Sequence, residues 1–142
     1  MCPTLGGFTA DNLSRVPHLS RLTAEAGITV EEIVDNRLSL LRRMATFCVR
    51  LVCGADAGIQ PHKDHGKYTD AVIDLAHVTG STPALVAATS GAATAIGLGS
   101  TKGRLRPGHD ADLLVVTGDL STGPTALHDV KQVLLRGHPV PR

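Results

Sequence analysis

Apolar residues recur at helical spacing in two stretches of the first half of the chain. The first runs from Leu13 to Gly27 and predicts a short helix that the glycine would end. The second runs from about Val30 to Ala45 and predicts a longer helix. Thr29 precedes it, and the Thr29 hydroxyl and the Glu32 carboxylate have the spacing of a capping box, which satisfies free amides of the first helical turn.

Two more helices are predicted in the second half of the chain. One runs from about Thr69 to His77, and Gly80 lies where a glycine in the left-handed conformation commonly closes a helix. The other runs from Ala84 to about Ile96, after a hydroxyl and proline start signal at residues 81–83. Gly91 lies inside this alanine-rich stretch, so we expect close packing against a neighbouring element.

Short apolar runs predict buried strands at Val49–Cys53, Ala111–Thr117 and Val130–Arg136. Strands that alternate with helices are typical of an α/β architecture. The glycine-rich stretch from Gly97 to Gly103 follows a predicted helix and precedes a turn. A phosphate-binding loop instead places its glycines between a strand and the following helix, so a nucleotide-binding domain is disfavoured.

Composition narrows the class of protein. The 142 residues suffice for one compact domain, and 42% hydrophobic with 19% charged residues is typical of a globular chain. The net charge of +1 gives no electrostatic argument for nucleic acid or membrane, and an aromatic content of 2% leaves almost nothing to stack on bases. Three cysteines without a CxxC pair, no apolar run of about 20 residues and no signal-peptide pattern favour a cytoplasmic protein.

Asp56 is the first candidate for chemistry. It directly follows the predicted strand Val49–Cys53 and lies on a turn between small residues, including Gly54 and Gly58. In α/β barrels, catalytic groups project from the carboxyl ends of parallel strands, where the loops leave the sheet open to substrate. An aspartate can equally cap its own turn through its side chain. The residues alone leave both interpretations open.

Two other patterns have the spacing of metal ligands. His62 and His65 form an HxxH pair, but Pro61 and Gly66 favour a loop, and the pair by itself is a weak signal. Asp110 and Asp112 flank the entrance of a predicted strand with DxD spacing. Carboxylates there more often accept hydrogen bonds from backbone amides than hold a metal, and we favour that interpretation.

Four short segments have the order and spacing seen in one protein family: Gly54–Ile59, Thr82–Thr89, Ala93–Leu98 and Gly103–Val116. Together they resemble the C-terminal part of a metal-dependent amidohydrolase of the imidazolonepropionase and prolidase-like kind. The resemblance extends over nearly the whole chain from Cys2 onward. Phe47-Cys48 depart from it, because the family usually places a glycine before this strand.

The resemblance implies a fold class. We expect the last strands and helices of a (β/α)8 barrel plus the C-terminal strands of an accessory β-sandwich, with the barrel incomplete. Residues 1–98 would supply barrel strands seven and eight with the following helices, and residues 99–142 would supply the β-sandwich segment. Cys2–Leu5 would end strand seven, and Val49–Cys53 would form strand eight.

The resemblance also implies an activity. Asp56 would match the aspartate that binds the metal and exchanges a proton with the attacking water. His65, in a His-Gly pair similar to one in the substrate loop of some members, would bind substrate. The cofactor would be a divalent metal, with zinc the first candidate, and the reaction the hydrolysis of a C–N bond in a small cyclic amide, amidine or dipeptide-like molecule.

The family's remaining metal ligands would precede Met1. We therefore expect a truncated amidohydrolase that neither retains the metal nor acts alone, because a catalytic zinc takes about three protein ligands. Its partners would be the small-molecule substrate and either the missing barrel half or further copies of the chain, without nucleic acid or membrane. The alternative is a non-catalytic α/β module, or inactive remnant, that pairs with another chain through its open sheet edge.

Overall fold

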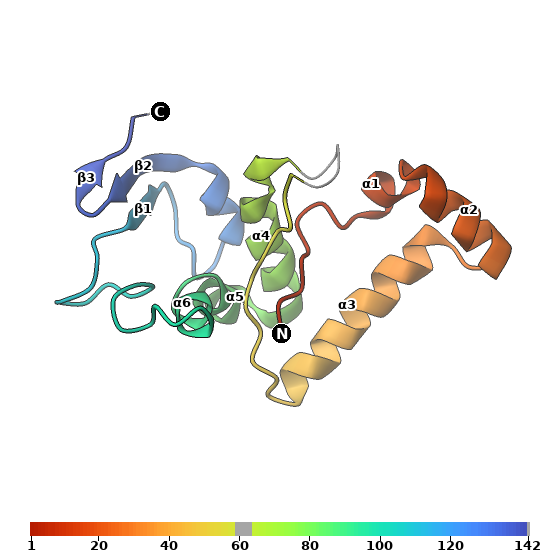
Figure 1. Cartoon of the computed structure of the whole chain (residues 1–142), viewed down its shortest axis with the longest axis horizontal. Helices are drawn as coiled ribbons and strands as arrows, with labels where there is room; N and C mark the ends of the chain where they lie inside the picture. Colours follow the sequence, from red (N-terminus) through yellow and green to blue (C-terminus); the bar gives the residue numbers. More distant parts are fainter. Residues whose placement is uncertain (59–63, 142) are drawn as a thin grey trace.

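The computed structural model describes residues 1–58 and 64–141. Within these ranges the chain forms six α-helices, two short 3-10 helices and one three-stranded sheet. In chain order the elements are α1 (Ala10–Ser14), α2 (Pro17–Ala26), α3 (Val30–Thr46), η1 (His65–Lys67), α4 (Tyr68–Thr79), α5 (Ser81–Ala88), α6 (Ser90–Ala95), β1 (Leu113–Val116), η2 (Pro124–His128), β2 (Val130–Leu135) and β3 (His138–Pro139). Helices α1 to α3 lie on one side of α4 and the sheet lies on the other (Figure 1).

Helix α4 carries the most deeply buried side chains. Ala71 and Leu75 have no exposed surface, and the same core cluster includes Leu5 from the first segment and Leu41 from α3. Leu127 of η2 joins this cluster, so the segment that leads into β2 is attached to α4. A fully buried leucine contributes about 1.5–3 kcal/mol relative to an exposed one. The parts of the molecule are therefore held together mainly through α4.

The capping box predicted before α3 is confirmed. The Thr29 amide donates to Glu32 Oε2 at 2.7 Å, and the Glu32 amide donates to Thr29 Oγ1 at 3.1 Å. The helix runs from Val30 to Thr46, one residue beyond the predicted end. Cys48, just after it, has a φ of 55°. The chain thus takes a left-handed backbone at Cys48, within the Phe47-Cys48 pair where the resemblance leads us to expect a glycine.

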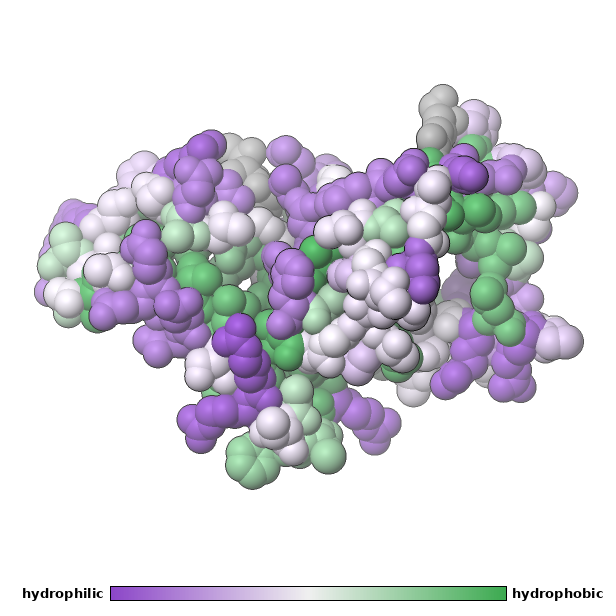
Figure 2. All heavy atoms as spheres, turned by 180° about the vertical axis from the view of Figure 1, so that it is seen from behind, coloured by the Kyte–Doolittle hydropathy of each residue, from purple (hydrophilic) through white to green (hydrophobic). Residues whose placement is uncertain are grey.

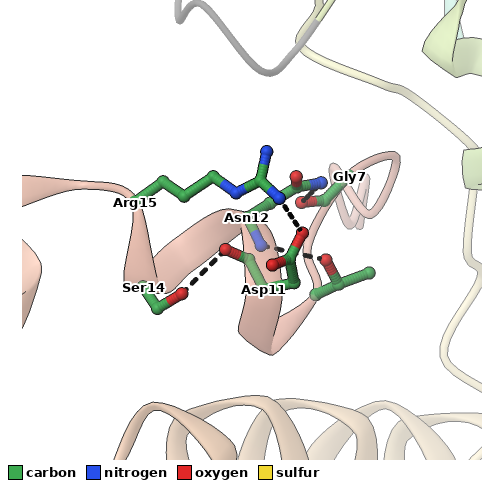
Figure 3. A network of polar contacts seen from close by, with 6 residues as sticks. Gly7, Asp11, Asn12, Ser14 and Arg15 are labelled. Carbon is green, nitrogen blue, oxygen red and sulfur yellow. Dashed lines mark hydrogen bonds and ion pairs between the residues drawn. The ribbon is translucent and has the colours of Figure 1, made fainter.

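The single helix predicted from Leu13 to Gly27 is instead two helices. Pro17 has no amide hydrogen to donate and lies in the first turn of α2, so the chain breaks before it. Thr9 caps α1 by accepting from the Asn12 amide at 3.3 Å. Figure 3 shows the polar contacts that close this short helix, including the ion pair between Arg15 and Asp11 at 2.7 Å.

The helix predicted from Ala84 to Ile96 is also two helices. The break falls at Thr89, whose φ of −122° and ψ of −93° lie outside the helical region. Close packing at Gly91 is confirmed, because a Cβ there would lie 2.9 Å from the Val86 carbonyl oxygen. The predicted hydroxyl cap is wrong: α5 begins at Ser81 after Gly80, without a side-chain cap. Gly80 does follow α4, but its ψ of 158° is not that of the left-handed cap.

The predicted strand at Val49–Cys53 does not form a regular sheet strand. This extended segment runs parallel to the first residues of the chain: the Met1 amine donates to the Arg50 carbonyl at 2.8 Å, and the Val52 amide donates to the Met1 carbonyl at 2.9 Å. One further parallel bridge joins Thr4 to Gly54. The Cys53 amide donates to the Ala87 carbonyl of α5, at 3.0 Å, so the ladder is interrupted there.

The two later predicted strands are confirmed as β1 and β2, and β2 also pairs with β3. Both pairings are antiparallel, with an irregularity between Val115 and Val116 of β1. The predicted burial is wrong, because Leu114 is 49% and Leu135 is 56% exposed. Figure 2 shows apolar surface at this end of the molecule. Within the described ranges, no helix combines the length and apolar character needed to cross a bilayer.

We expect Thr29→Ala to lower the free energy of unfolding by about 1 kcal/mol, because the variant loses the hydroxyl that satisfies the Glu32 amide. Ser39→Ala is the matched control, since it removes an exposed hydroxyl from the interior of the same helix. Urea unfolding of the two variants and the parent chain measures the difference. An equal loss in both variants would contradict a capping role for Thr29.

Candidate functional site

Asp56 lies just beyond the point where the two parallel segments meet. The Thr4 to Gly54 bridge is their last pairing, and Ala55 is buried before the chain turns outward. Asp56 itself is exposed and has a φ of 54°, a left-handed conformation that few residue types other than glycine adopt readily. Its carboxylate is therefore presented at the carboxyl end of a parallel pair, where α/β folds place reactive groups.

The structure brings His65 to the same turn. Gly58 has a φ of 87°, and a Cβ at this position would lie 2.8 Å from both Cε1 and Nε2 of the His65 ring. The imidazole therefore packs against the bare backbone two residues after Asp56. His62, the other histidine of the HxxH pair, lies outside the described residues, so the weak metal signal of this pair is not tested by the structure.

The described residues do not by themselves form a metal centre. Among them, no three histidine, cysteine, aspartate or glutamate side chains are close enough to hold an ion. A catalytic zinc takes about three protein ligands and keeps one position open. A carboxylate such as that of Asp56 fits as one oxygen ligand, and the donor set of this part of the chain provides no complete site.

The DxD pair forms a structural ion-pair cluster. Lys102 Nζ lies 2.8 Å from Asp110 Oδ2 and also contacts Asp112, and the Arg136 amide donates to Asp112 Oδ1 at 2.9 Å. The interpretation that these carboxylates accept backbone hydrogen bonds is confirmed for Asp112. The lysine ammonium lies between the two carboxylates, where a metal cation would have to bind.

Sequence reasoning missed the role of Lys102. It comes from the glycine-rich stretch between Gly97 and Gly103, and the loop that follows folds back to bring the two aspartates to it. The hydrogen bond from Lys102, followed by that from the Arg136 amide, lowers the pKa of Asp112. The hydrogen bond to Asp110, followed by that to Asp112, raises the pKa of Lys102. A lone lysine in a glycine-rich loop was the only sequence signal.

A second group of titratable side chains includes Cys53, at the end of the extended segment before Asp56, and Tyr68, at the start of α4. Burial, and then the neighbouring Cys2, raise the pKa of the Cys53 thiol to about 11. Burial, and then Cys53, raise the pKa of Tyr68 to about 12, and its hydroxyl donates to the Ala88 carbonyl at 3.1 Å. Both groups are therefore neutral at pH 7, and they serve packing and hydrogen bonding better than nucleophilic chemistry.

The comparisons with known proteins agree with this geometry. The sequence profile described as the Amidohydrolase family matches residues 13–141, and the chain belongs to this family. A search among curated proteins found no significant match.

Solved structures share the fold. A putative prolidase from Bifidobacterium longum superposes with a TM-score of 0.80 at 24% identity, covering 99% of this chain and 35% of the prolidase. A Xaa-Pro dipeptidase with methionine bound in its active site gives 0.76 at 20% identity, covering 96% of this chain and 32% of the dipeptidase.

A zinc-bound adenosine deaminase from Xanthomonas campestris gives a TM-score of 0.57 at 18% identity, covering 92% of this chain and 48% of the deaminase. The chain spans about a third of the length of the prolidase and the dipeptidase. The expected fold class, an α/β segment of an incomplete amidohydrolase fold with a small antiparallel sheet, is confirmed.

We expect Lys102→Met to raise the pKa of the Asp112 carboxyl toward its usual range, because the main cause of the lowered value is removed. A carboxyl with a lowered folded pKa stabilises the fold above its unfolded pKa, and this stabilisation is lost as the pH falls through the folded value. The variant should therefore lose less stability than the parent on acidification. Carboxyl NMR titration and urea unfolding between about pH 2 and pH 7 measure both effects.

Lys131→Met is the control for this experiment, since it removes an exposed lysine from β2. Because the cluster is solvent-exposed, the difference between parent and Lys102→Met should shrink at high salt. An unchanged Asp112 pKa in Lys102→Met would show that the ammonium does not set it.

Proposed function

We propose that this chain is part of a metal-dependent amidohydrolase that hydrolyses a C–N bond in a small cyclic amide, amidine or dipeptide-like substrate. The observation that carries the proposal is the position of Asp56. Its carboxylate follows a parallel pair of extended segments in a chain that belongs to the amidohydrolase family. The prolidase and dipeptidase relatives make Xaa-Pro dipeptides the first substrates to test.

The proposed chemistry needs a carboxylate at this position. A divalent ion at this site, with zinc the first candidate, would lower the pKa of a water molecule bound to it. The Asp56 carboxylate accepts a proton from the attacking water and donates it to the nitrogen that leaves as the C–N bond breaks. Exposure of Asp56 at the end of the parallel pair leaves room for the substrate. The resemblance predicts that His65, at the same turn, contacts that substrate.

We propose that residues 1–98 belong to the barrel and residues 99–142 to the β-sandwich, and that other polypeptide completes the site. Two observations support this. The described residues form no metal centre of their own, and the chain spans about a third of its structural relatives. The further ligands would come from the rest of the barrel, in the same polypeptide or in a separate chain. Further copies of this chain are the other candidate partners.

The isolated 142-residue chain should bind no stoichiometric zinc. One carboxylate from an incomplete ligand set cannot hold a catalytic ion tightly. Elemental analysis of the untagged chain after dialysis against zinc measures the metal content. One tightly held ion per chain would overturn our account of the site as incomplete.

Asp56→Asn should lower kcat by about 10²–10⁴-fold in a polypeptide that joins these residues to the remaining barrel, because the amide cannot exchange the proton. Hydrolysis of Xaa-Pro dipeptides and of cyclic amides, assayed with zinc present, measures the effect. Asp129→Asn, at an exposed aspartate between η2 and β2, is the matched control and should keep full activity.

If the joined polypeptide binds zinc but hydrolyses none of these substrates, the substrate class is wrong. If it neither binds zinc nor hydrolyses a C–N bond, the alternative of a non-catalytic module that pairs with another chain is favoured. Size-exclusion chromatography with light scattering then tests whether the chain associates with itself.

A further inference from the structure

We propose that His65 is a positioning residue for Asp56. Its imidazole lies against the bare backbone of Gly58 and holds the turn that carries the carboxylate. The catalytic meaning of this contact rests on the proposed function, whereas the contact itself is a property of the chain. The following observations lead to it.

The backbone of the turn is unfavourable on its own. Asp56 has a φ of 54° and Gly58 has a φ of 87°. A left-handed backbone costs a residue other than glycine about 1 kcal/mol, although aspartate tolerates it better than most. Such conformations persist where surrounding structure fixes them. A contact that packs on Gly58 from outside the turn therefore helps to fix the backbone that carries Asp56.

His65 supplies that contact. A Cβ on Gly58 would lie 2.8 Å from Cε1 and Nε2 of the ring, closer than real side chains approach. The absence of a side chain at position 58 is thus what lets the imidazole reach the backbone. Because residues 59–63 separate the two in the sequence, the contact joins the turn to a separate element, η1.

His65 belongs to a segment that is anchored to the core. It begins η1, which leads directly into α4, the most deeply buried helix of the described chain. Gly6, which follows the first segment, approaches the Lys67 carbonyl so closely that a Cβ there would collide with it. Lys67 also pairs with Asp70 of α4 at 3.1 Å. The close approach of Gly6 thus fixes the start of α4 against the first residues of the chain, and the contact of His65 joins this start to Gly58.

A positioning role and a substrate-binding role predict different results. Binding of substrate through the polar nitrogens would raise KM, and no apolar ring would replace the histidine. Support of the turn needs only a flat ring of similar size. His65→Phe should therefore keep the kcat that His65→Ala loses. Loss of support misplaces the carboxylate and lowers kcat with little change in KM.

Amide exchange of the full 142-residue chain, followed by NMR, tests the contact directly. We expect His65→Ala to raise the exchange rate at Asp56 and Gly58 by about threefold or more, with α4 amides unchanged. His65→Phe should restore the parent rate. His18→Ala, at an exposed histidine of α2, is the matched control.

A double-mutant cycle isolates the pair. Gly58→Ala displaces the ring and also strains the turn, so the strain is present with and without His65. We expect Gly58→Ala to accelerate exchange at Asp56 much less in the His65→Ala background than in the parent. Additive effects, or an unchanged exchange rate in His65→Ala, would overturn the proposal whatever the role of Asp56.

The catalytic consequence is measured in the joined polypeptide. We expect His65→Ala to lower kcat by about tenfold at unchanged KM, and His65→Phe to recover most of it. If His65→Ala raises KM and His65→Phe does not recover activity, His65 binds substrate and the positioning proposal is wrong. If the cycle shows coupling while Asp56→Asn leaves kcat unchanged, the contact stands and the proposed role of Asp56 fails.

Discussion

The buried face of α4 is the constraint on which the other elements depend. Ala71 and Leu75 lie in a core that also receives Leu5 from the first segment, Leu41 from α3 and Leu127 from η2. A single helix thus fixes three parts of the chain that are far apart in sequence. Because α4 begins directly after η1, the same burial also fixes the start of the helix beside the Asp56 turn. Helix α4 therefore supports both the core packing and the candidate site.

Features set by local interactions could be predicted from the sequence. The capping box of Thr29 and Glu32 involves residues three apart, so its pattern is visible in the chain. The two later strands follow one another in the sequence, joined by residues 117–129, and they keep their predicted positions. The break before Pro17 is also encoded locally, because proline has no amide hydrogen to donate, but the prediction of a single helix used only the apolar spacing.

Features set by distant partners could not be predicted in this way. The segment from Val49 to Cys53 has the composition of a buried strand, yet in the described chain it pairs with only one neighbour and gives the Cys53 amide to α5. Exposure of Leu114 and Leu135 on the sheet has the same cause, because burial depends on what covers the sheet and not on the strand's own residues. Apolar character alone predicts a tendency toward burial.

The same distinction between local interactions and distant partners applies to the candidate site. The turn around Asp56 could be identified because a carboxylate between glycines after an apolar run is a local pattern. The packing of His65 on Gly58, and the place of Lys102 between two aspartates, arise only when separate segments meet. Lys102 satisfies the DxD carboxylates within the chain, which removes them as metal ligands. Asp56 lies instead on an exposed turn, at the end of the parallel pair.

A turn held in this way has a definite physical consequence for the family's chemistry. If a ligand residue becomes ordered only when the ion or substrate binds, the free energy of that ordering is subtracted from the binding free energy. In the arrangement that we propose, a left-handed Asp56 held by the start of α4 is ordered by folding, before an ion or substrate binds. The packing of α4 and the geometry of the turn are thus parts of one arrangement, in which stability far from the carboxylate preorganises the carboxylate itself.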